Sequence, residues 1–207
     1  MRRLPIAIIM ALVLSFVVAA ALLGCEANTQ ASGSDKPKAD NEPQPSKEDA
    51  IVQSAMSAAP MSIAKDAAIV DYPTEAGEPL IKVRKGTNGW TCFPDWQATP
   101  GNDPQCFDEM WMKWNDAFMG GTKPNITTPG IAYMLQGGSD ASNTDPMAMK
   151  PPKGEEWLST GPHIMILVPG KVGSARFTTD HHSGEPWLMW AGTPYEHVMV
   201  PVKNEAK

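Results

Sequence analysis

The sequence predicts an α+β fold: a single compact domain with a mainly antiparallel sheet and one or two helices packed on it. Three observations support this prediction. Short apolar runs with strand-like alternation recur through the second half of the chain, one segment carries aromatic residues at helical spacing, and 20 prolines and 17 glycines interrupt the sequence. Frequent proline and glycine favour short elements joined by turns over long helices.

The first expected elements lie between residues 48 and 86. Residues 48–60 (EDAIVQSAMSAAP) combine helical spacing of apolar residues with an alanine-rich composition and a final proline, so they predict a helix. Residues 67–72 (AAIVDY) and 79–86 (PLIKVRKG) predict strands, the second because its apolar and basic side chains alternate.

A second helix is expected to begin at Asp103, because aspartate is a favoured N-cap and Pro104 suits the first helical position. This helix would carry an aromatic face and end at Gly120 and Gly121. The aromatic face consists of Phe107, Trp111, Trp114 and Phe118. Later strands are expected at residues 130–138, 163–169, 186–192 and 197–202.

The N-terminus has the pattern of an export signal. Arg2 and Arg3 precede an apolar run over residues 4–23 that only Pro5 and Ser15 interrupt. A charged region followed by an apolar region is typical of a signal peptide. About 20 apolar residues would also be enough to cross a bilayer, so the end of the run must distinguish a signal peptide from an uncleaved anchor.

The run ends in Leu22-Leu23-Gly24-Cys25, which resembles the lipobox of bacterial lipoproteins. The resemblance implies that residues 1–24 are a signal peptide and that Cys25 carries several acyl chains such as palmitate, which suffice for stable membrane anchoring. Glu26 in the next position implies the outer membrane, facing the periplasm, if the cell is Gram-negative. An uncleaved anchor with an incidental cysteine is the alternative.

Residues 25–48 are expected to be a disordered tether, and residues 49–207 a globular domain. Residues 26–50 contain no aromatic residue and no aliphatic residue larger than alanine, so they cannot bury enough apolar surface to fold. Loss of Arg2 and Arg3 with the signal peptide leaves 15 basic and 23 acidic residues, a net charge of about −8. This charge argues against nucleic acid or an anionic lipid surface as the partner.

Cys92 and Cys106 are the two cysteines outside the lipobox. In an oxidising compartment they are expected to form a disulfide, which would stabilise the fold by about 3 kcal/mol in the chain-entropy model. A redox-active or metal-binding thiol pair is the alternative. The spacing of 14 residues and the absence of a C-x-x-C motif argue against it.

Two short segments, HIMIL and HVM, each place a histidine and a methionine two residues apart. Residues two apart share one face of a strand, so His163 and Met165 would face one way, as would His197 and Met199. If the two strands pair, these side chains offer imidazole and thioether ligands that suit copper, especially Cu(I). Alternatively, the methionines fill the core and each histidine binds a backbone carbonyl or a carboxylate such as Glu196.

Two loops carry further candidate ligand-binding groups. Those of the loop SDASNTDP are Asp140, Ser142, Asn143 and Asp145. They could bind calcium, but the EF-hand spacing and closing glutamate are missing, and Asx turns explain the same residues. Those of the loop TTDHHSGEP are Asp180, His181 and His182. Adjacent histidines on an extended chain point to opposite sides, so at most one would join a given site.

A resemblance covers most of the globular domain, roughly residues 55–202. The segments GTNGWTCFPD, TPGNDPQC, GIAYMLQGGSDASNTDP, GPHIMILVP and WAGTPYEHVMVPV resemble those of a family of uncharacterised exported bacterial proteins. The resemblance implies one domain type. It lends no activity, substrate or catalytic residue.

The sequence as a whole predicts a lipid-anchored cell-envelope protein with a non-catalytic binding or structural domain and no required cofactor. Its partner would be the membrane, through the anchor, together with an envelope protein or a small ligand. One alternative is a hydrolase-like envelope enzyme in which His163 or His197 acts with Asp140 or Asp180 as acid and base. The other is a copper-binding lipoprotein that uses the two His-x-Met strands.

Overall fold

The computed structural model describes residues 46–75, 77–170, 172–173 and 176–202. The chain divides into two units, Met1–Glu42 and Pro43–Lys207, and the description below concerns the second. The predicted signal peptide and the predicted lipidation site Cys25 lie outside the described residues, as does the predicted tether up to residue 45. Residues 46–48, also assigned to the tether, instead cap and begin the first helix. Among the helices of the described part, none has the length and apolar character needed to cross a membrane.

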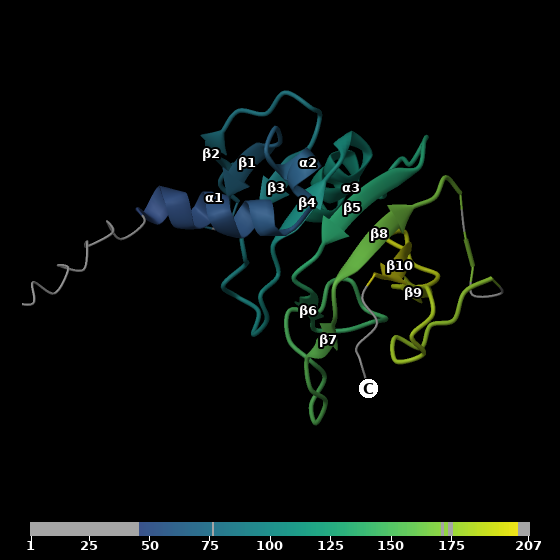
Figure 1. Ribbon diagram of the computed structural model, residues 1–207. Coiled ribbons are helices and arrows are strands. Elements are labelled where there is room, and N and C mark those ends of the chain that lie inside the picture. The colour runs from purple at the N-terminus through teal and green to yellow at the C-terminus, as the bar shows by residue number, and fades with distance from the viewer. Residues whose placement is uncertain (1–45, 76, 171, 174–175, 203–207) are drawn as a thin grey trace, which may run out of the picture. The chain divides into compact units, whose positions relative to one another are not determined.

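The fold is α+β, as predicted. An eight-stranded sheet has the order β2-β1-β3-β4-β5-β8-β10-β9, and β6 and β7 form a separate two-stranded sheet (Figure 1). The described strands pair antiparallel except β1 with β3. The strands are β1 (Ala68–Asp71), β2 (Ile81–Arg84), β3 (Thr91–Phe93), β4 (Gln105–Phe107), β5 (Gly130–Met134), β6 (Gly138–Asp140), β7 (Leu158–Thr160), β8 (His163–Leu167), β9 (Trp187–Met189) and β10 (His197–Pro201).

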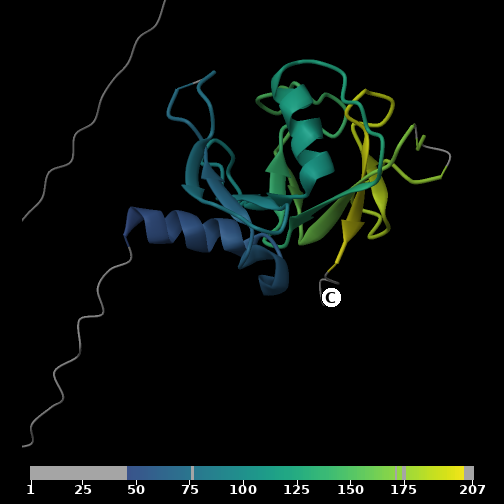
Figure 2. The ribbon, with the colours of Figure 1, turned by 90° about the horizontal axis from the view of Figure 1, so that it is seen from above.

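Helices α1 and α3 cover opposite faces of the large sheet (Figure 2). The described helices are α1 (Lys47–Ser57), the single turn α2 (Met61–Ala64) and α3 (Glu109–Met119). On the α1 side, small alanines of α1 and α2 pack with Cys92 and Cys106. On the α3 side, Phe93 and Phe107 join a core rich in tryptophan and methionine. Alternation along β3 and β4 therefore divides neighbouring residues between two separate cores.

The predicted disulfide between Cys92 and Cys106 is confirmed. The two cysteines lie directly opposite each other in the β3–β4 register, and both are fully buried. The bond therefore joins adjacent strands beneath α1, on the face of the sheet opposite α3.

The predicted start of the aromatic helix at Asp103 is wrong. Residues 105–107 form β4, which pairs with β3 and β5, and α3 begins only after Asp108. The Asp108 side chain accepts hydrogen bonds from the backbone N–H groups of Met110 (3.0 Å) and Trp111 (2.8 Å). Strand pairing and the disulfide thus hold Cys106 in an extended segment, and a second capping aspartate starts the helix five residues later.

Asp108 also joins α3 to the sheet, because its second carboxylate oxygen accepts from the N–H of Ile131 at 2.6 Å. Replacing Asp108 by alanine is therefore expected to lower the free energy of unfolding by about 2–3 kcal/mol, through the lost cap and the unpaired N–H of Ile131. Urea unfolding measures this change. Asp116→Ala, at an exposed position of the same helix, should change stability by less than about 0.5 kcal/mol. Equal effects of the two variants would contradict this role of Asp108.

Candidate functional site

Strands β8 and β10 carry the two His-x-Met segments and pair antiparallel. The copper-site hypothesis requires this pairing. Met199 lies directly opposite Met165, and Pro201 lies opposite His163. All four predicted ligands are buried on the α3 side of the sheet, with 3% exposure for His163, 2% for His197, 6% for Met165 and 3% for Met199. The structure therefore brings both His-x-Met segments to one buried face.

The registers of β5, β8, β10 and β9 arrange this face in rows of side chains. In that strand order the rows are Met134–His163–Pro201, Ala132–Met165–Met199–Trp187 and Gly130–Leu167–His197–Met189. The Leu167–His197 pair continues the register of the neighbouring pair, Ile166 with Val198. The Met165–Met199 pair therefore occupies the row between the two histidines. Met189, which the sequence analysis did not single out, lies directly opposite His197.

Each histidine contacts a backbone carbonyl, as the alternative interpretation of these residues as core predicts. Nδ1 of His163 lies 2.8 Å from the carbonyl oxygen of Gly161, and Nδ1 of His197 lies 3.0 Å from that of Tyr195. A carbonyl can only accept, so these contacts assign the proton of each neutral imidazole to Nδ1 and leave a lone pair on Nε2. Both Nε2 atoms are buried, and no described residue forms a hydrogen bond to either. A backbone carbonyl at Nδ1 and a free Nε2 is a common arrangement of metal-binding histidine.

Burial lowers the pKa of both imidazoles to about 4, so they are neutral at pH 7. The positive form of His163 contributes to the lowered pKa of His197, because the rings are close enough to repel each other when charged. Neutral imidazole is the form that binds metal ions. Both side chains are thus ready to coordinate a metal without losing a proton from Nε2.

The alternative partner predicted for the histidines, Glu196, is used elsewhere. Its carboxylate accepts hydrogen bonds from the backbone N–H groups of Val172 and Gly173, both at 3.1 Å, and of Gly192 at 2.7 Å. Its charge favours the protonated form of His197, but this effect is smaller than the effect of burial. Glu196 therefore holds loops together and leaves Nδ1 of His197 to the carbonyl of Tyr195.

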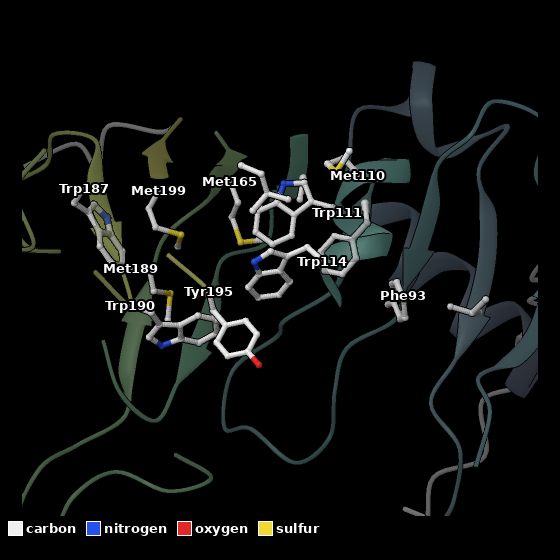
Figure 3. Close-up of a cluster of buried hydrophobic side chains, with 14 residues drawn as sticks. Phe93, Met110, Trp111, Trp114, Met165, Trp187, Met189, Trp190, Tyr195 and Met199 are labelled. Carbon is white, nitrogen blue, oxygen red and sulfur yellow. The ribbon is translucent and has the colours of Figure 1, made fainter. Parts of the chain in front are cut away.

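Helix α3 covers the histidine–methionine face with aromatic side chains (Figure 3). It approaches β5 closely at Gly130, where an added Cβ would lie 3.1 Å from side-chain atoms of both Met110 and Leu167. Trp111, Trp114 and Trp190 surround His197, with ring centroids at 5.2, 5.7 and 5.2 Å from the imidazole. The face is therefore enclosed by apolar and aromatic groups.

The SDASNTDP loop makes hydrogen bonds within its own turns. Asp140 accepts from the N–H of Ser142 at 3.0 Å, and Asp145 accepts from the N–H of Met147 at 2.9 Å. Asn143 donates through its side-chain amide to the carbonyl of Thr179 at 2.8 Å. These contacts agree with the Asx-turn interpretation. In the part of the chain that the structure describes, no group of three or more His, Cys, Asp or Glu residues is placed to bind a metal ion, so this loop gains no support as a calcium site.

The second loop differs from its prediction. Asp180 accepts from the N–H of His182 at 2.9 Å, and the rings of His181 and His182 lie only 3.8 Å apart between centroids. The expectation that adjacent histidines point to opposite sides is wrong here, because this segment is a turn and not an extended chain. The His181 ring also lies 5.9 Å from the ring of Trp187 between centroids, and Trp187 belongs to the row of Met165 and Met199. The pair therefore borders the buried face.

The pairing of a buried histidine with Asp140 or Asp180 gains no support either. Each buried Nδ1 faces a backbone carbonyl, and Asp180 contacts its own turn. Burial raises the pKa of Asp140 to about 6, and the charge that adds to this rise is that of Asp103. Asp140 is thus coupled to another carboxylate, and the structure gives no histidine–aspartate acid–base pair at these positions.

Comparison of the chain with protein-family models, with curated proteins and with solved structures gives no significant match.

Proposed function

We propose that this chain is a lipid-anchored envelope protein whose domain is a non-catalytic binding module for a soft metal ion, Cu(I) first among them. One observation carries the proposal. Two thioethers, Met165 and Met199, lie side by side in the row between two neutral imidazoles, whose Nε2 atoms are buried without a hydrogen-bond partner among the described residues. Thioether and imidazole are ligands that suit Cu(I).

The two buried Nε2 atoms favour metal binding over a role in core packing alone. A buried acceptor that lacks a hydrogen bond is costly, and native structures leave few of them. Nε2 of His163 and of His197 are such acceptors, on the same face as the methionine pair. The indole Nε1 atoms of Trp111 and Trp114 are also buried without a partner, but they are donors and cannot bind a metal ion. A metal ion that accepts the lone pairs of the two histidines would satisfy both Nε2 atoms, whereas methionine alone would have filled the core without this cost.

The test is a Cu(I) titration of the full chain, purified without oxygen and in competition with a coloured Cu(I) chelator. We expect one Cu(I) per chain, and we expect the His163→Leu, His197→Leu double variant to lose it. A control is His182→Leu, which removes an exposed histidine outside the buried face. No Cu(I) uptake by the wild type, or full uptake by the variant lacking both buried histidines, would overturn the proposal.

The affinity for Cu(I) is expected to depend little on pH between 7 and 5. The lowered pKa of about 4 keeps His163 and His197 neutral over this range, so protons barely compete with the metal. The affinity should fall by less than about fourfold, whereas each exposed histidine with an ordinary pKa would lower it by about 25-fold. Chelator competition at both pH values measures this. A steep fall would place the metal on exposed histidines instead.

The anchoring part of the proposal is tested separately, in bacteria fed labelled palmitate. We expect the wild type to carry label in the membrane fraction and Cys25→Ala to lose the label and leave that fraction. Ser32→Ala, in the predicted tether, should behave as the wild type. Continued labelling of the Cys25→Ala chain would contradict lipidation at this residue.

A further inference from the structure

We propose that Met189 is a third thioether ligand of this site and that the tryptophans around His197 restrict the site to soft monovalent cations, Cu(I) and Ag(I). This inference rests on the proposed function. It goes further, because it names an additional ligand and the class of ion that the site selects.

Met189 has the position that a further ligand requires. It lies directly opposite His197 in the β9–β10 register and is 5% exposed. Met199 lies two residues along the same face from His197, and Met165 lies opposite Met199. Opposed side chains start about 5 Å apart at Cβ and diagonal ones about 7–8 Å, which the long methionine side chain can span. Three thioethers thus lie on the same face as His197, in its own row and in the neighbouring row.

Figure 3 shows how these sulfur atoms lie in the core. Met165 and Met199 extend in the same direction from neighbouring strands, with Met189 beside them and Trp114 and Trp190 nearby. Met110 belongs to the same core, but it lies on the other side of Trp111 from these three in this view. We therefore infer that Met110 is buried in this core but is not a ligand of the site.

Among the described residues, the carboxylate whose charge acts on His197 is that of Glu196. Glu196 is next to His197 in sequence, but its carboxylate binds three backbone N–H groups on other loops. The free energy of transferring an ion out of water grows with the square of its charge, so a divalent ion costs about four times as much as a monovalent ion of equal size. A neutral, buried set of sulfur and nitrogen ligands therefore favours a single positive charge.

The tryptophan rings around His197 would stabilise a bound cation further. The rings of Trp111, Trp114 and Trp190 stand at 80°, 82° and 83° to the imidazole of His197. The faces of tryptophan rings attract cations within about 6 Å, more strongly where water is excluded. Such rings stabilise a weakly hydrated monovalent ion without supplying a formal charge.

Trp190 has a backbone conformation that bulky residues rarely adopt. Trp190 has φ = 53°, the only positive φ among the described residues other than glycine. Its backbone N–H donates to the carbonyl of Asn143 at 2.9 Å, and its indole Nε1 donates to the carbonyl of Ser142 at 2.8 Å. A strained bulky residue persists where surrounding contacts fix it, and such residues gather at binding sites. The SDASNTDP loop thus positions one wall of the site.

The test compares Met189→Leu with the matched control Met110→Leu in the full chain, using Cu(I), Ag(I) and Zn(II) salts as probes. Both changes conserve volume in the same core. We expect Met189→Leu to weaken Cu(I) and Ag(I) binding by about tenfold or more, and Met110→Leu to leave both affinities unchanged. In the wild type, Ag(I) should quench tryptophan emission until one equivalent is bound, and Zn(II) should not compete.

The outcomes separate this inference from the function on which it rests. If the wild type binds Cu(I) and the two leucine variants have equal affinity, Met189 is not a ligand and the proposed function stands. If Zn(II) displaces Ag(I) at equal concentration, the selection of monovalent ions is wrong. If the wild type binds neither Cu(I) nor Ag(I), both the inference and the proposed function are overturned.

Discussion

Replacing Met165 and Met199 together by leucine is expected to weaken Cu(I) binding by about a hundredfold or more and to leave the domain folded. The two thioethers lie side by side in the row between the histidines. The double change therefore removes the sulfur atoms that distinguish this face from an ordinary core. Leucine and methionine have similar volumes, and each exchange should cost less than about 1.5 kcal/mol of stability. Chelator competition measures the affinity, and thermal unfolding measures the stability.

The control for this variant is the double change Met147→Leu, Met149→Leu. These methionines are 49% and 69% exposed and lie outside the core, so their loss should alter neither quantity. If the Met165→Leu, Met199→Leu chain keeps its Cu(I) affinity, the opposed thioethers are core packing and the metal site must be sought elsewhere. If this variant loses Cu(I) affinity only because it unfolds, the two methionines contribute to stability, and the claim that their sulfur atoms bind Cu(I) is wrong.

Removing the disulfide by the double change Cys92→Ala, Cys106→Ala is expected to lower the free energy of unfolding by about 3 kcal/mol. The bond closes a loop of 14 residues, and its loss gives the unfolded chain more conformational freedom. For a domain of this size the melting temperature should fall by roughly 6–12 °C. Both sulfur atoms are fully buried beneath α1, so the loss of packing adds to the effect.

The same variant should bind Cu(I) as the wild type does, at a temperature where it is folded. Cys92 and Cys106 face the α1 side of the sheet, whereas the histidine–methionine face lies under α3. A change in melting temperature of only a degree or two would contradict the stabilising role of the bond. Loss of Cu(I) binding by the folded variant would indicate that the cysteines belong to the metal site.

Local periodicity predicted much of this site. Alternation along HIMIL and HVM placed His163 with Met165 and His197 with Met199, and the structure has both pairs buried. The pairing of β8 with β10 could not be predicted in the same way. Twenty-nine residues, one further strand among them, separate the two segments, and their register depends on packing against α3 and on contacts with β5 and β9.

Met189 was missed because its segment carries no alternation. Residues 187–189 are all buried, and a continuous apolar run does not show which side chains share a face. The predicted helix start failed for a related reason. Asp103 and Asp108 both have capping chemistry, and the choice between them depends on the pairing of β4 with strands that are distant in sequence. A second acidic residue after Asp108, Glu109 in the first turn, was a local signal in its favour.

The predictions that concern the N-terminus remain predictions. The lipobox, the lipid anchor and the outer-membrane location depend on residues outside those that the structure describes. The disulfide between Cys92 and Cys106 is confirmed independently of them.

X-ray absorption spectroscopy of the full chain loaded with one equivalent of Cu(I) tests the central claim most directly, because it reports the atoms bound to the metal. We expect a Cu(I) edge, with sulfur atoms and at least one imidazole nitrogen bound to the metal. A spectrum with only oxygen and nitrogen ligands, or a chain that retains no copper after desalting, would contradict it and identify the histidine–methionine face as core.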